Sequence, residues 1–217
     1  MTTDVSIIIP TLNAAALLPA TLAALGQGPE VIVVDGGSTD ATVALATAFG
    51  ARILTAPRGR GTQIAAGIAV ASHPWLLLLH ADTTLSPDWR AAAHRTATRA
   101  GYFRFVLDSG DPRARRLERM VDWRSRVLGL PYGDQGLLIH RDLLRAVGGM
   151  KPLPLMEDVD LARRLGRSRL TALPADAVTS ARKWETQGYL RRSARNLLCL
   201  SLWFAGVPPW LIRRIYE

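Results

Sequence analysis

Two turns that carry aspartates follow two apolar runs of this chain. The apolar residues 31–34 lead into Asp35, and residues 75–79 lead into His80 and Asp82. Runs of four or five large apolar residues are typical of parallel strands that are buried on both faces. Because ligands of open α/β sheets bind beyond the carboxyl ends of such strands, both carboxylates stand where ligands are expected. One suits the base or ribose of a nucleotide, and the other suits a divalent cation.

An acidic cluster and a basic loop add to this pattern. Glu157, Asp158 and Asp160 supply three acids within four residues near the start of a predicted helix over residues 156–165, more than the helix dipole needs. The glycine-rich loop of residues 58–62 can receive a phosphate through backbone N–H groups and guanidinium charge. The loop lacks the spacing of a Walker loop, and the alternative is an ordinary basic surface turn.

The elements that must position these residues alternate in type along the first third of the chain. This alternation predicts a parallel, doubly wound sheet up to residue 79, and looser order beyond residue 82. We expect Asn13 to cap the first helix, and Thr39 or Asp40 to cap the second. The expected strands are residues 5–9, 31–34, 52–55, 75–79, 102–107 and 136–140, and the expected helices are residues 14–25, 40–48, 64–71, 112–128, 156–165 and 189–205.

Length and composition fit one folded domain with a basic C-terminal third. The chain has 217 residues, of which 48% are hydrophobic, and a net charge of +9. Residues 161–217 hold 11 basic and 3 acidic side chains. Such a region suits nucleic acid, an anionic membrane, a phosphorylated substrate or simply solvent. Cys199 is the only cysteine and is expected in the core, so no intramolecular disulfide can form.

Targeting signals are also expected to be absent. The N-terminus lacks the basic and then apolar layout of a signal peptide. The longest apolar stretch, residues 197–207, is shorter than the roughly 20 residues of a membrane span and stops at Pro208 and Pro209. We therefore expect a cytoplasmic protein, with the basic tail able to rest on the inner face of the membrane.

Six motifs in order resemble the family 2 glycosyltransferases of the GT-A fold, in the superfamily of nucleotide-diphospho-sugar transferases. The resemblance implies one Rossmann-like α/β domain over residues 1–217, with a mostly parallel central sheet flanked by helices. Residues 1–110 would bind the nucleotide sugar, residues 111–188 the acceptor, and residues 189–217 would form an amphipathic helical tail. The motifs are VSIIIPTLNA, VIVVDGGSTDAT, RGRGTQIAAGI, WLLLLHAD, YGDQG and MEDVDLARRL.

The family usually carries an Asp-x-Asp metal motif where this chain has His80, Ala81 and Asp82. Asp82 remains as the usual metal contact and implies Mn²⁺ or Mg²⁺, which need only one or two carboxylates besides substrate phosphates. His80 could be a second ligand, a hydrogen-bond partner of a phosphate, or a structural residue. The full nucleotide-binding set implied by the loop and the resemblance is Pro10, Thr11, Asn13, Asp35, Gly37, Arg58, Gly61 and Asp82.

The resemblance also implies a catalytic base and an acceptor site. Asp158 would take the proton of the acceptor hydroxyl as that oxygen attacks the anomeric carbon. Glu157 would orient the acceptor or a neighbouring basic group. Thr179 stands where processive members carry the glutamine of Q-x-x-R-W. Arg182 and Lys183 could contact the diphosphate, and Trp184 suits either sugar stacking or core packing. The expected acceptor-binding residues are Gly133, Asp134, Gln135, Glu157, Arg182 and Trp184.

The resulting hypothesis is a non-processive, inverting glycosyltransferase. Its donor would be a nucleotide diphospho-sugar, with UDP preferred, and its acceptor a sugar, a lipid-linked sugar or a small metabolite, but not nucleic acid. One alternative is a sugar-phosphate nucleotidyltransferase, although those enzymes carry their glycine-rich loop directly after the first strand. The others are a non-catalytic membrane-surface module and a degenerate, inactive transferase. The tail could equally close the core or a dimer interface.

Overall fold

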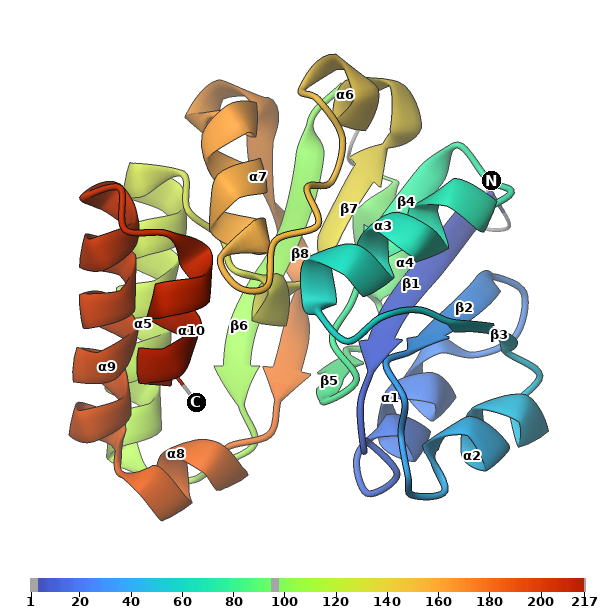
Figure 1. The fold of residues 1–217 in the computed structure, drawn as a ribbon, viewed down its shortest axis with the longest axis horizontal. Helices are drawn as coiled ribbons and strands as arrows, with labels where there is room; N and C mark the ends of the chain where they lie inside the picture. The colour runs from blue at the N-terminus through green and yellow to red at the C-terminus, as the bar shows by residue number, and fades with distance from the viewer. Residues whose placement is uncertain (1–3, 95–97, 217) are drawn as a thin grey trace.

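The computed structural model describes residues 4–94 and 98–216. Within them, the strands form one sheet in the order β3-β2-β1-β4-β7-β6-β8-β5, with helices on both faces (Figure 1). The strands are β1 (Val5–Thr11), β2 (Glu30–Asp35), β3 (Arg52–Thr55), β4 (Trp75–Leu78), β5 (Thr83–Leu85), β6 (Ala100–Leu107), β7 (Leu137–His140) and β8 (Leu170–Thr179). The helices are α1 (Leu18–Leu25), α2 (Thr42–Ala48), α3 (Arg60–Val70), α4 (Trp89–Ala93), α5 (Pro112–Leu128), α6 (Arg141–Ala146), α7 (Glu157–Leu165), α8 (Arg182–Gln187), α9 (Tyr189–Phe204) and α10 (Pro209–Tyr216).

The half of the sheet formed by β3, β2, β1 and β4 is parallel, as the sequence predicts. Strands β1, β2 and β4 are mostly apolar because both of their faces are covered, whereas Arg52 and Thr55 of the edge strand β3 are exposed. Ile7 and Ile9 pack in the cluster that includes α1, whereas Ile8 packs in the cluster that includes Ile64 of α3. The predicted α/β class is confirmed, and the carboxyl ends of β1, β2 and β4 meet at one edge.

The other half of the sheet is mixed rather than parallel. Strand β7 runs antiparallel to both β4 and β6, and β5 runs antiparallel to β8. Strand β8 pairs with β6 in parallel. The sequence analysis did not predict β5 or β8. In β8, Pro174 and several alanines replace the large apolar residues that mark a buried strand, so the strand has no clear signal.

Two predicted boundaries near the strand ends are wrong. The first helix begins at Leu18 rather than residue 14, and Asn13 does not cap it. Instead Asn13 has a φ of 49°, and its Oδ1 accepts the N–H of Thr39 at 2.9 Å. The basic loop is also shorter than predicted because α3 begins at Arg60. Asp40 is not the N-cap of α2, which is Ala41, but its Oδ1 accepts the N–H of Thr42 in the first turn at 3.0 Å.

The C-terminal tail is a pair of helices that folds back onto the domain. The tail bends after α9 at the paired prolines, and α10 returns alongside α9 (Figure 1). Cys199 and Ile212 are fully buried against Leu155, which confirms the core position of the cysteine. Among the residues that the structure describes, no helix is long and apolar enough to span a bilayer.

Candidate active site

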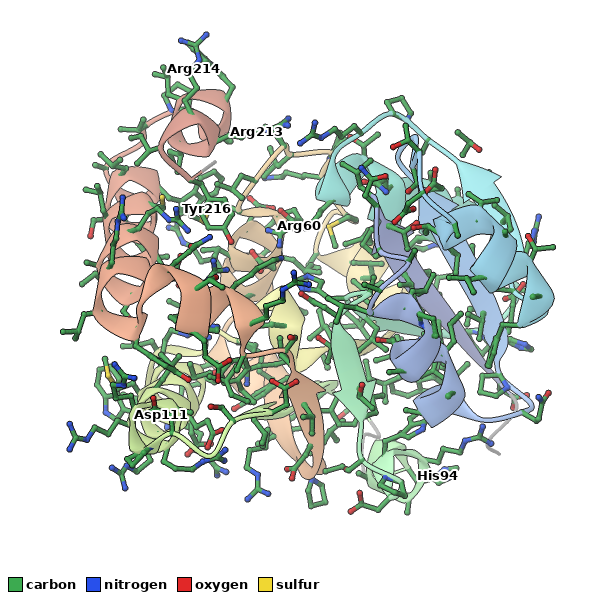
Figure 2. The ribbon with its side chains drawn as sticks, turned by 90° about the horizontal axis from the view of Figure 1, so that it is seen from below. Arg60, His94, Asp111, Arg213, Arg214 and Tyr216 are labelled. Atoms are coloured by element: carbon green, nitrogen blue, oxygen red, sulfur yellow. The ribbon has the colours of Figure 1, made fainter. Side chains whose placement is uncertain are left out.

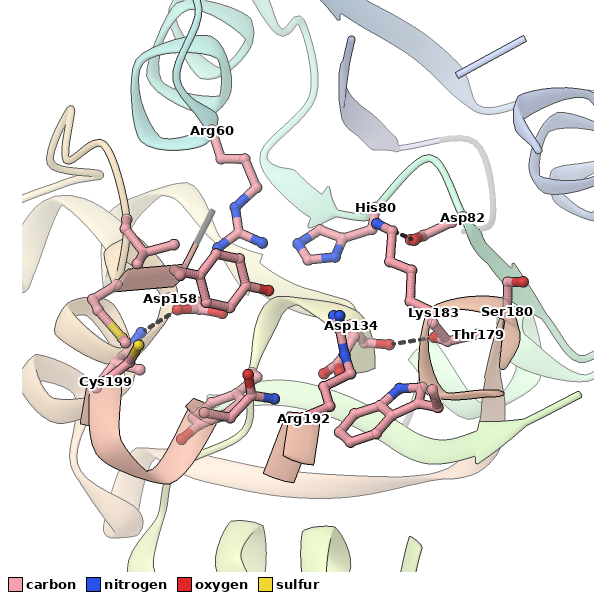
Figure 3. A pocket seen from close by; sticks show the side chains of 17 residues that line it. Arg60, His80, Asp82, Asp134, Asp158, Thr179, Ser180, Lys183, Arg192 and Cys199 are labelled. Carbon is pink, nitrogen blue, oxygen red and sulfur yellow. Dashed lines mark hydrogen bonds and ion pairs between the residues drawn. The ribbon is translucent and has the colours of Figure 1, made fainter. Parts of the chain in front are cut away.

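Two cavities meet beyond the carboxyl ends of β1 and β4. The strand-end cavity has a volume of about 410 Å³, and the tail cavity has about 130 Å³. The larger volume lies within the range of typical small-molecule sites. The strand-end cavity is lined by residues that include Pro10, Thr11, Asn13, Arg58 and Asp82. The tail cavity is lined by residues that include Asp134, Asp158, Lys183, Arg192 and Asn196 (Figure 3).

The two cavities share six residues, which form the boundary between them. A ligand at this boundary would contact side chains that line both cavities. Three of the shared side chains are basic or imidazole groups and one is a carboxylate, so the boundary suits an anionic group. The shared residues are Arg60, His80, Asp82, Leu155, Lys183 and Tyr216.

Asp35 holds the turn after β2 and is not among the residues that line either cavity. Its side chain is 4% exposed. Its carboxylate accepts hydrogen bonds from the N–H groups of Gly37 at 2.9 Å and Ser38 at 2.8 Å, and from the Thr11 hydroxyl at 3.1 Å. Burial raises the pKa of Asp35, but these hydrogen bonds outweigh it and hold the pKa below its usual value. Asp35 and Gly37 therefore shape the turn after β2, and the hydrogen bond from Thr11 ties this turn to the end of β1.

Gly61 packs against backbone instead of facing a cavity. It lies in the first turn of α3, where an added Cβ would be 2.6 Å from the carbonyl oxygen of Lys151. Only glycine permits this approach. Arg58, from the same predicted loop, does line the strand-end cavity. Arg58 and Gly61, which were both expected to bind the nucleotide, therefore differ in position: Arg58 lines a cavity and Gly61 packs against backbone.

Asp158 and His80 face each other across Gly133. The N–H of Gly133 donates to Asp158 Oδ2 at 2.9 Å, and Val159 N–H donates to its Oδ1 at 2.8 Å. An added Cβ on Gly133 would lie 2.4 Å from His80 Nε2. Met156, just before α7, has a φ of 64°, a rare conformation that turns the chain sharply into the acidic pair. These contacts fix the Asp158 carboxylate at the wall of the tail cavity.

Arg60 and Glu157 form an ion pair at the boundary. Arg60 Nε lies 2.8 Å from Glu157 Oε1, and the Glu157 side chain is 1% exposed. Burial raises the pKa of Glu157 against the pull of Arg60. Burial and the nearby Arg60 guanidinium lower the pKa of His80, so its imidazole is neutral at pH 7. Glu157 thus orients a basic group, one of the two roles that the sequence analysis left open.

Asp82 faces the cavities and forms an ion pair with Lys183, whose Nζ lies 3.7 Å from its Oδ2 (Figure 3). His80 lines the same two cavities and offers a ring nitrogen as an additional donor for a cation. Within residues 4–94 and 98–216, no three His, Cys, Asp or Glu side chains gather in a way that could hold a metal. The residues therefore fit a cation that is held largely by the phosphates of a ligand, rather than one enclosed by the protein.

Asp134 lines the tail cavity, but Gln135 does not line it. Burial raises the pKa of Asp134 to about 6, and its Oδ1 has no hydrogen-bond partner within the described part of the chain. Gln135 is 1% exposed. Its amide bonds the Ser125 hydroxyl at 2.8 Å and the Phe103 carbonyl at 3.1 Å. The expectation that Gln135 faces a ligand is wrong in this structure, because its amide secures the turn beneath Asp134.

The two candidates from α8 also differ in position. Arg182 is exposed and is not among the lining residues of either cavity. Trp184 lines the tail cavity but is 8% exposed. Its ring stacks with Tyr189 at a centroid distance of 6.1 Å, and the Arg192 guanidinium lies 5.0 Å from its centroid. Trp184 is therefore mainly a packing residue, and the neighbouring Lys183 is the α8 side chain that reaches the boundary.

The tail supplies site residues that the sequence analysis missed. Arg192 and Asn196 lie one helical turn apart on α9, and Tyr216 ends α10. Figure 2 shows Tyr216 and Arg213 of α10 on the side of the molecule where Arg60 lies. Arg192 Nε and Asn196 Oδ1 are buried without a hydrogen-bond partner among the described residues. The excess of arginine in the tail was the available signal, but nothing in the sequence placed it at the site.

The fold and the joined cavities define an α/β protein whose cavities lie beyond the carboxyl ends of its parallel strands, where ligands of such sheets bind. The model of the family described as "Glycosyl transferase family 2" matches residues 6–128, more than half of the chain. The chain belongs to glycosyl transferase family 2, as the motifs predicted. It is 38% identical over 82 residues to an uncharacterized glycosyltransferase of Mycobacterium bovis. That segment covers 37% of this chain and only 38% of the relative's length.

Solved structures show the same fold. TarS of S. aureus (residues 1–349) superposes with a TM-score of 0.66 at 15% identity, covering 98% of this chain and 69% of TarS. The mannosyltransferase PcManGT of Pyrobaculum calidifontis, solved with GDP-Man and Mn²⁺, superposes with a TM-score of 0.65 at 20% identity, covering 88% of this chain and 59% of PcManGT. The likeness confirms the predicted GT-A fold.

Proposed function

We propose that this protein transfers a sugar from a nucleotide diphospho-sugar to an acceptor hydroxyl, with inversion and without processivity. The observation that carries the proposal is the meeting of the two cavities at His80, Asp82 and Lys183, with Asp158 on one side. The donor nucleotide would occupy the strand-end cavity and the acceptor the tail cavity. Membership of the family favours transfer over a nucleotidyltransferase or a non-catalytic module.

The donor side rests on residues at the end of β1, just after β1 and just after β3. Pro10, Thr11 and Asn13 would line the nucleoside, and Arg58 would approach the diphosphate. TarS has been solved with UDP and with UDP-GlcNAc, whereas PcManGT was solved with GDP-Man. We propose a UDP-sugar as the first donor to test.

The acceptor side supplies the proton chemistry. The hydroxyl oxygen of the acceptor attacks the anomeric carbon, Asp158 takes its proton, and the bond from that carbon to the diphosphate oxygen breaks. The electron pair of that bond leaves with the diphosphate, which faces Arg60 and Lys183. The unpartnered Asp134 Oδ1, Asn196 Oδ1 and Arg192 Nε offer two acceptors and one donor, which suits a ligand rich in hydroxyl groups.

A divalent cation, Mn²⁺ or Mg²⁺, would be held by Asp82 together with the donor phosphates, and would neutralise charge on the diphosphate. His80 would contribute a neutral nitrogen beside it. PcManGT contains Mn²⁺ in its complex, which supports this proposal by analogy of fold. Asp82→Ala is therefore expected to remove any dependence of nucleotide binding on Mn²⁺.

Asp158→Asn tests the proposed reaction directly. The substitution keeps the shape of the side chain and removes the base, so turnover of the nucleotide sugar should fall by about three orders of magnitude or more. Affinity for the nucleoside diphosphate should stay within a few fold. Release of the nucleoside diphosphate and isothermal titration would measure the two quantities, and Asp142→Asn, an exposed acid on α6, is the control. Equal loss of turnover and nucleotide affinity would contradict the role of Asp158.

We also propose that the protein works on the cytoplasmic face of an anionic membrane. Leu190, Leu197 and Phe204 of α9 and Trp210 of α10 are 50–86% exposed, next to the arginines of the same helices. Exposed apolar and basic side chains together favour the surface of an anionic bilayer. Sedimentation with phosphatidylglycerol vesicles should carry the protein down, and a Leu190→Ser/Trp210→Ser variant should remain in solution. Equal sedimentation of both proteins would contradict this placement.

A further inference from the structure

Lys183 lies where the two cavities meet, beside the carboxylate that would hold the cation. Its Nζ is 3.7 Å from Asp82 Oδ2, and it lines both cavities (Figure 3). The Lys183 side chain is 63% exposed, whereas Asp82 is 23% exposed. A long, exposed side chain can turn, so the ammonium is able to leave Asp82 without disturbing packed neighbours.

The backbone fixes this arrangement although Asp82 and Lys183 are distant in sequence. Strand β5 begins at Thr83 and pairs with Thr179 at the end of β8. The hydroxyls of Thr83 and Thr179 are 3.1 Å apart, and the N–H of Ser180 donates to the carbonyl of Asp82 at 3.3 Å. These contacts hold the start of α8 against the Asp82 turn. The ammonium therefore stays within reach of Asp82 and of both cavities.

Lys183 is the movable cation of the boundary. Arg60 is held there by the buried Glu157 at 2.8 Å. Asp82 itself has few protein partners for a divalent cation, since the described residues hold no cluster of three or more suitable ligands. The Lys183 ammonium lies beside the Asp82 carboxylate. It therefore supplies positive charge at the place where a metal ion bound to Asp82 would supply it.

We propose that Lys183 is a built-in counter-cation of the donor diphosphate, which exchanges between Asp82 and the diphosphate. Without a donor, it neutralises Asp82. When a diphosphate enters, or when a divalent cation takes Asp82, the ammonium turns to the phosphate oxygens. The inference rests on the proposed function. It has two consequences: a nucleoside diphosphate binds even without a divalent cation, and Lys183 competes with a divalent cation for Asp82.

Binding measurements on Lys183→Gln and Lys183→Arg test both consequences, with Arg191→Gln as a control. Arg191 is exposed on α9 and is not among the lining residues of either cavity, and its substitution changes net charge equally. Titration calorimetry with UDP and GDP in EDTA should show about a tenfold loss of affinity for Lys183→Gln, as expected for a lost charged hydrogen bond. Lys183→Arg should stay within about threefold of the wild type because it keeps the charge. Arg191→Gln should leave the affinity unchanged.

Two further readouts concern the cation. With saturating Mn²⁺, the loss of nucleotide affinity in Lys183→Gln should shrink to about threefold or less, because Mn²⁺ then supplies most of the charge. Without nucleotide, Mn²⁺ alone should bind Lys183→Gln several fold more tightly than the wild type, as measured by the electron paramagnetic resonance signal of free Mn²⁺.

Each contrary result has a distinct meaning. If Lys183→Gln lost as much nucleotide affinity in Mn²⁺ as in EDTA, or lost none in EDTA, the proposed exchange of Lys183 between Asp82 and the diphosphate would be overturned. Unchanged Mn²⁺ binding in Lys183→Gln would overturn the competition for Asp82. If the wild type bound neither UDP nor GDP in either buffer, the proposed function itself would fail, and the inference with it.

Discussion

Replacing Gly133 with alanine is expected to destabilise the protein and disturb the site. An added Cβ would lie 2.4 Å from His80 Nε2, 3.0 Å from His80 Cε1 and 3.4 Å from Asp158 Oδ2. The turn cannot retreat easily because the Gly133 N–H is bonded to Asp158 at 2.9 Å. Overpacking of this kind costs about 1–3 kcal/mol, and the lower entropy of the unfolded alanine chain offsets about 0.4–1 kcal/mol. The net loss in the free energy of unfolding should be roughly 1–2 kcal/mol.

Gly110→Ala is the matched control for this substitution. An added Cβ at Gly110 meets no heavy atom within 4 Å, and its φ lies outside the left-handed range. Only the entropic effect remains, so Gly110→Ala should stabilise the protein by about 0.4–1 kcal/mol. Urea unfolding followed by tryptophan fluorescence would give both free energies. The double variant Gly133→Ala/His80→Ala should recover most of the loss, because the clashing ring is then absent.

Two results would refute this reasoning about the contact between Gly133 and His80. The first is a Gly133→Ala variant as stable as Gly110→Ala, which would mean that the turn moves at no cost. The second is additive behaviour of Gly133→Ala and His80→Ala, which would mean that the two positions do not touch. Nucleotide affinity and turnover measured on the same proteins would show whether Asp158 loses its position together with Gly133.

The other predictions concern pH. Burial raises the pKa of Asp134 to about 6, so the cost of burying its charge is absent below the unfolded pKa of 3.8 and grows as the pH rises through about 6. Asp134→Asn should therefore gain stability over the wild type between pH 4 and 8, as urea unfolding would show, and parallel stability curves would contradict the shift. The pKa of Asp35 is held below 3.8, so its stabilisation is present above that value and is lost as the pH falls through the folded-state pKa. Asp35→Asn should be less stable than the wild type at pH 6, with a gap that narrows below about pH 4 in acid titration, whereas a constant gap would contradict the assignment.

The parallel half of the sheet could be predicted because its signal is local. Strands β1, β2 and β4 are buried on both faces, so each is a continuous apolar run that ends at a polar turn. Strand β8 could not be predicted in this way because Pro174 and its alanines give no such run, and it is stabilised by pairing with β6 and β5. Local pattern therefore predicted six of the eight strands that the structure describes, and β5 and β8 depend on long-range pairing.

Residues of the candidate site were also predictable where a local motif marks them, and not where long-range folding brings them to the site. Pro10, Asp82 and Asp158 were predictable because they lie near the end of a strand, after a strand and at the start of a helix, within recognisable motifs. Lys183 was expected near the diphosphate from its motif alone, whereas Arg192 was not predicted, because it reaches the site only through folding of the tail onto Leu155. Asp35 and Gln135 have side chains that suit ligands, and in the structure both form hydrogen bonds that hold turns, which the sequence did not indicate.

Unfolding of the wild type in the presence of nucleotides tests the central claim most directly. UDP, GDP, CMP and dTDP would each be added with Mn²⁺ and with EDTA, and the free energy of unfolding would be measured in urea. At about 100 times its dissociation constant, a bound nucleotide should add roughly 2.7 kcal/mol. The account predicts this gain for at least one nucleoside diphosphate and none for CMP. No gain with any nucleotide in either buffer would contradict a nucleotide-sugar site in the strand-end cavity.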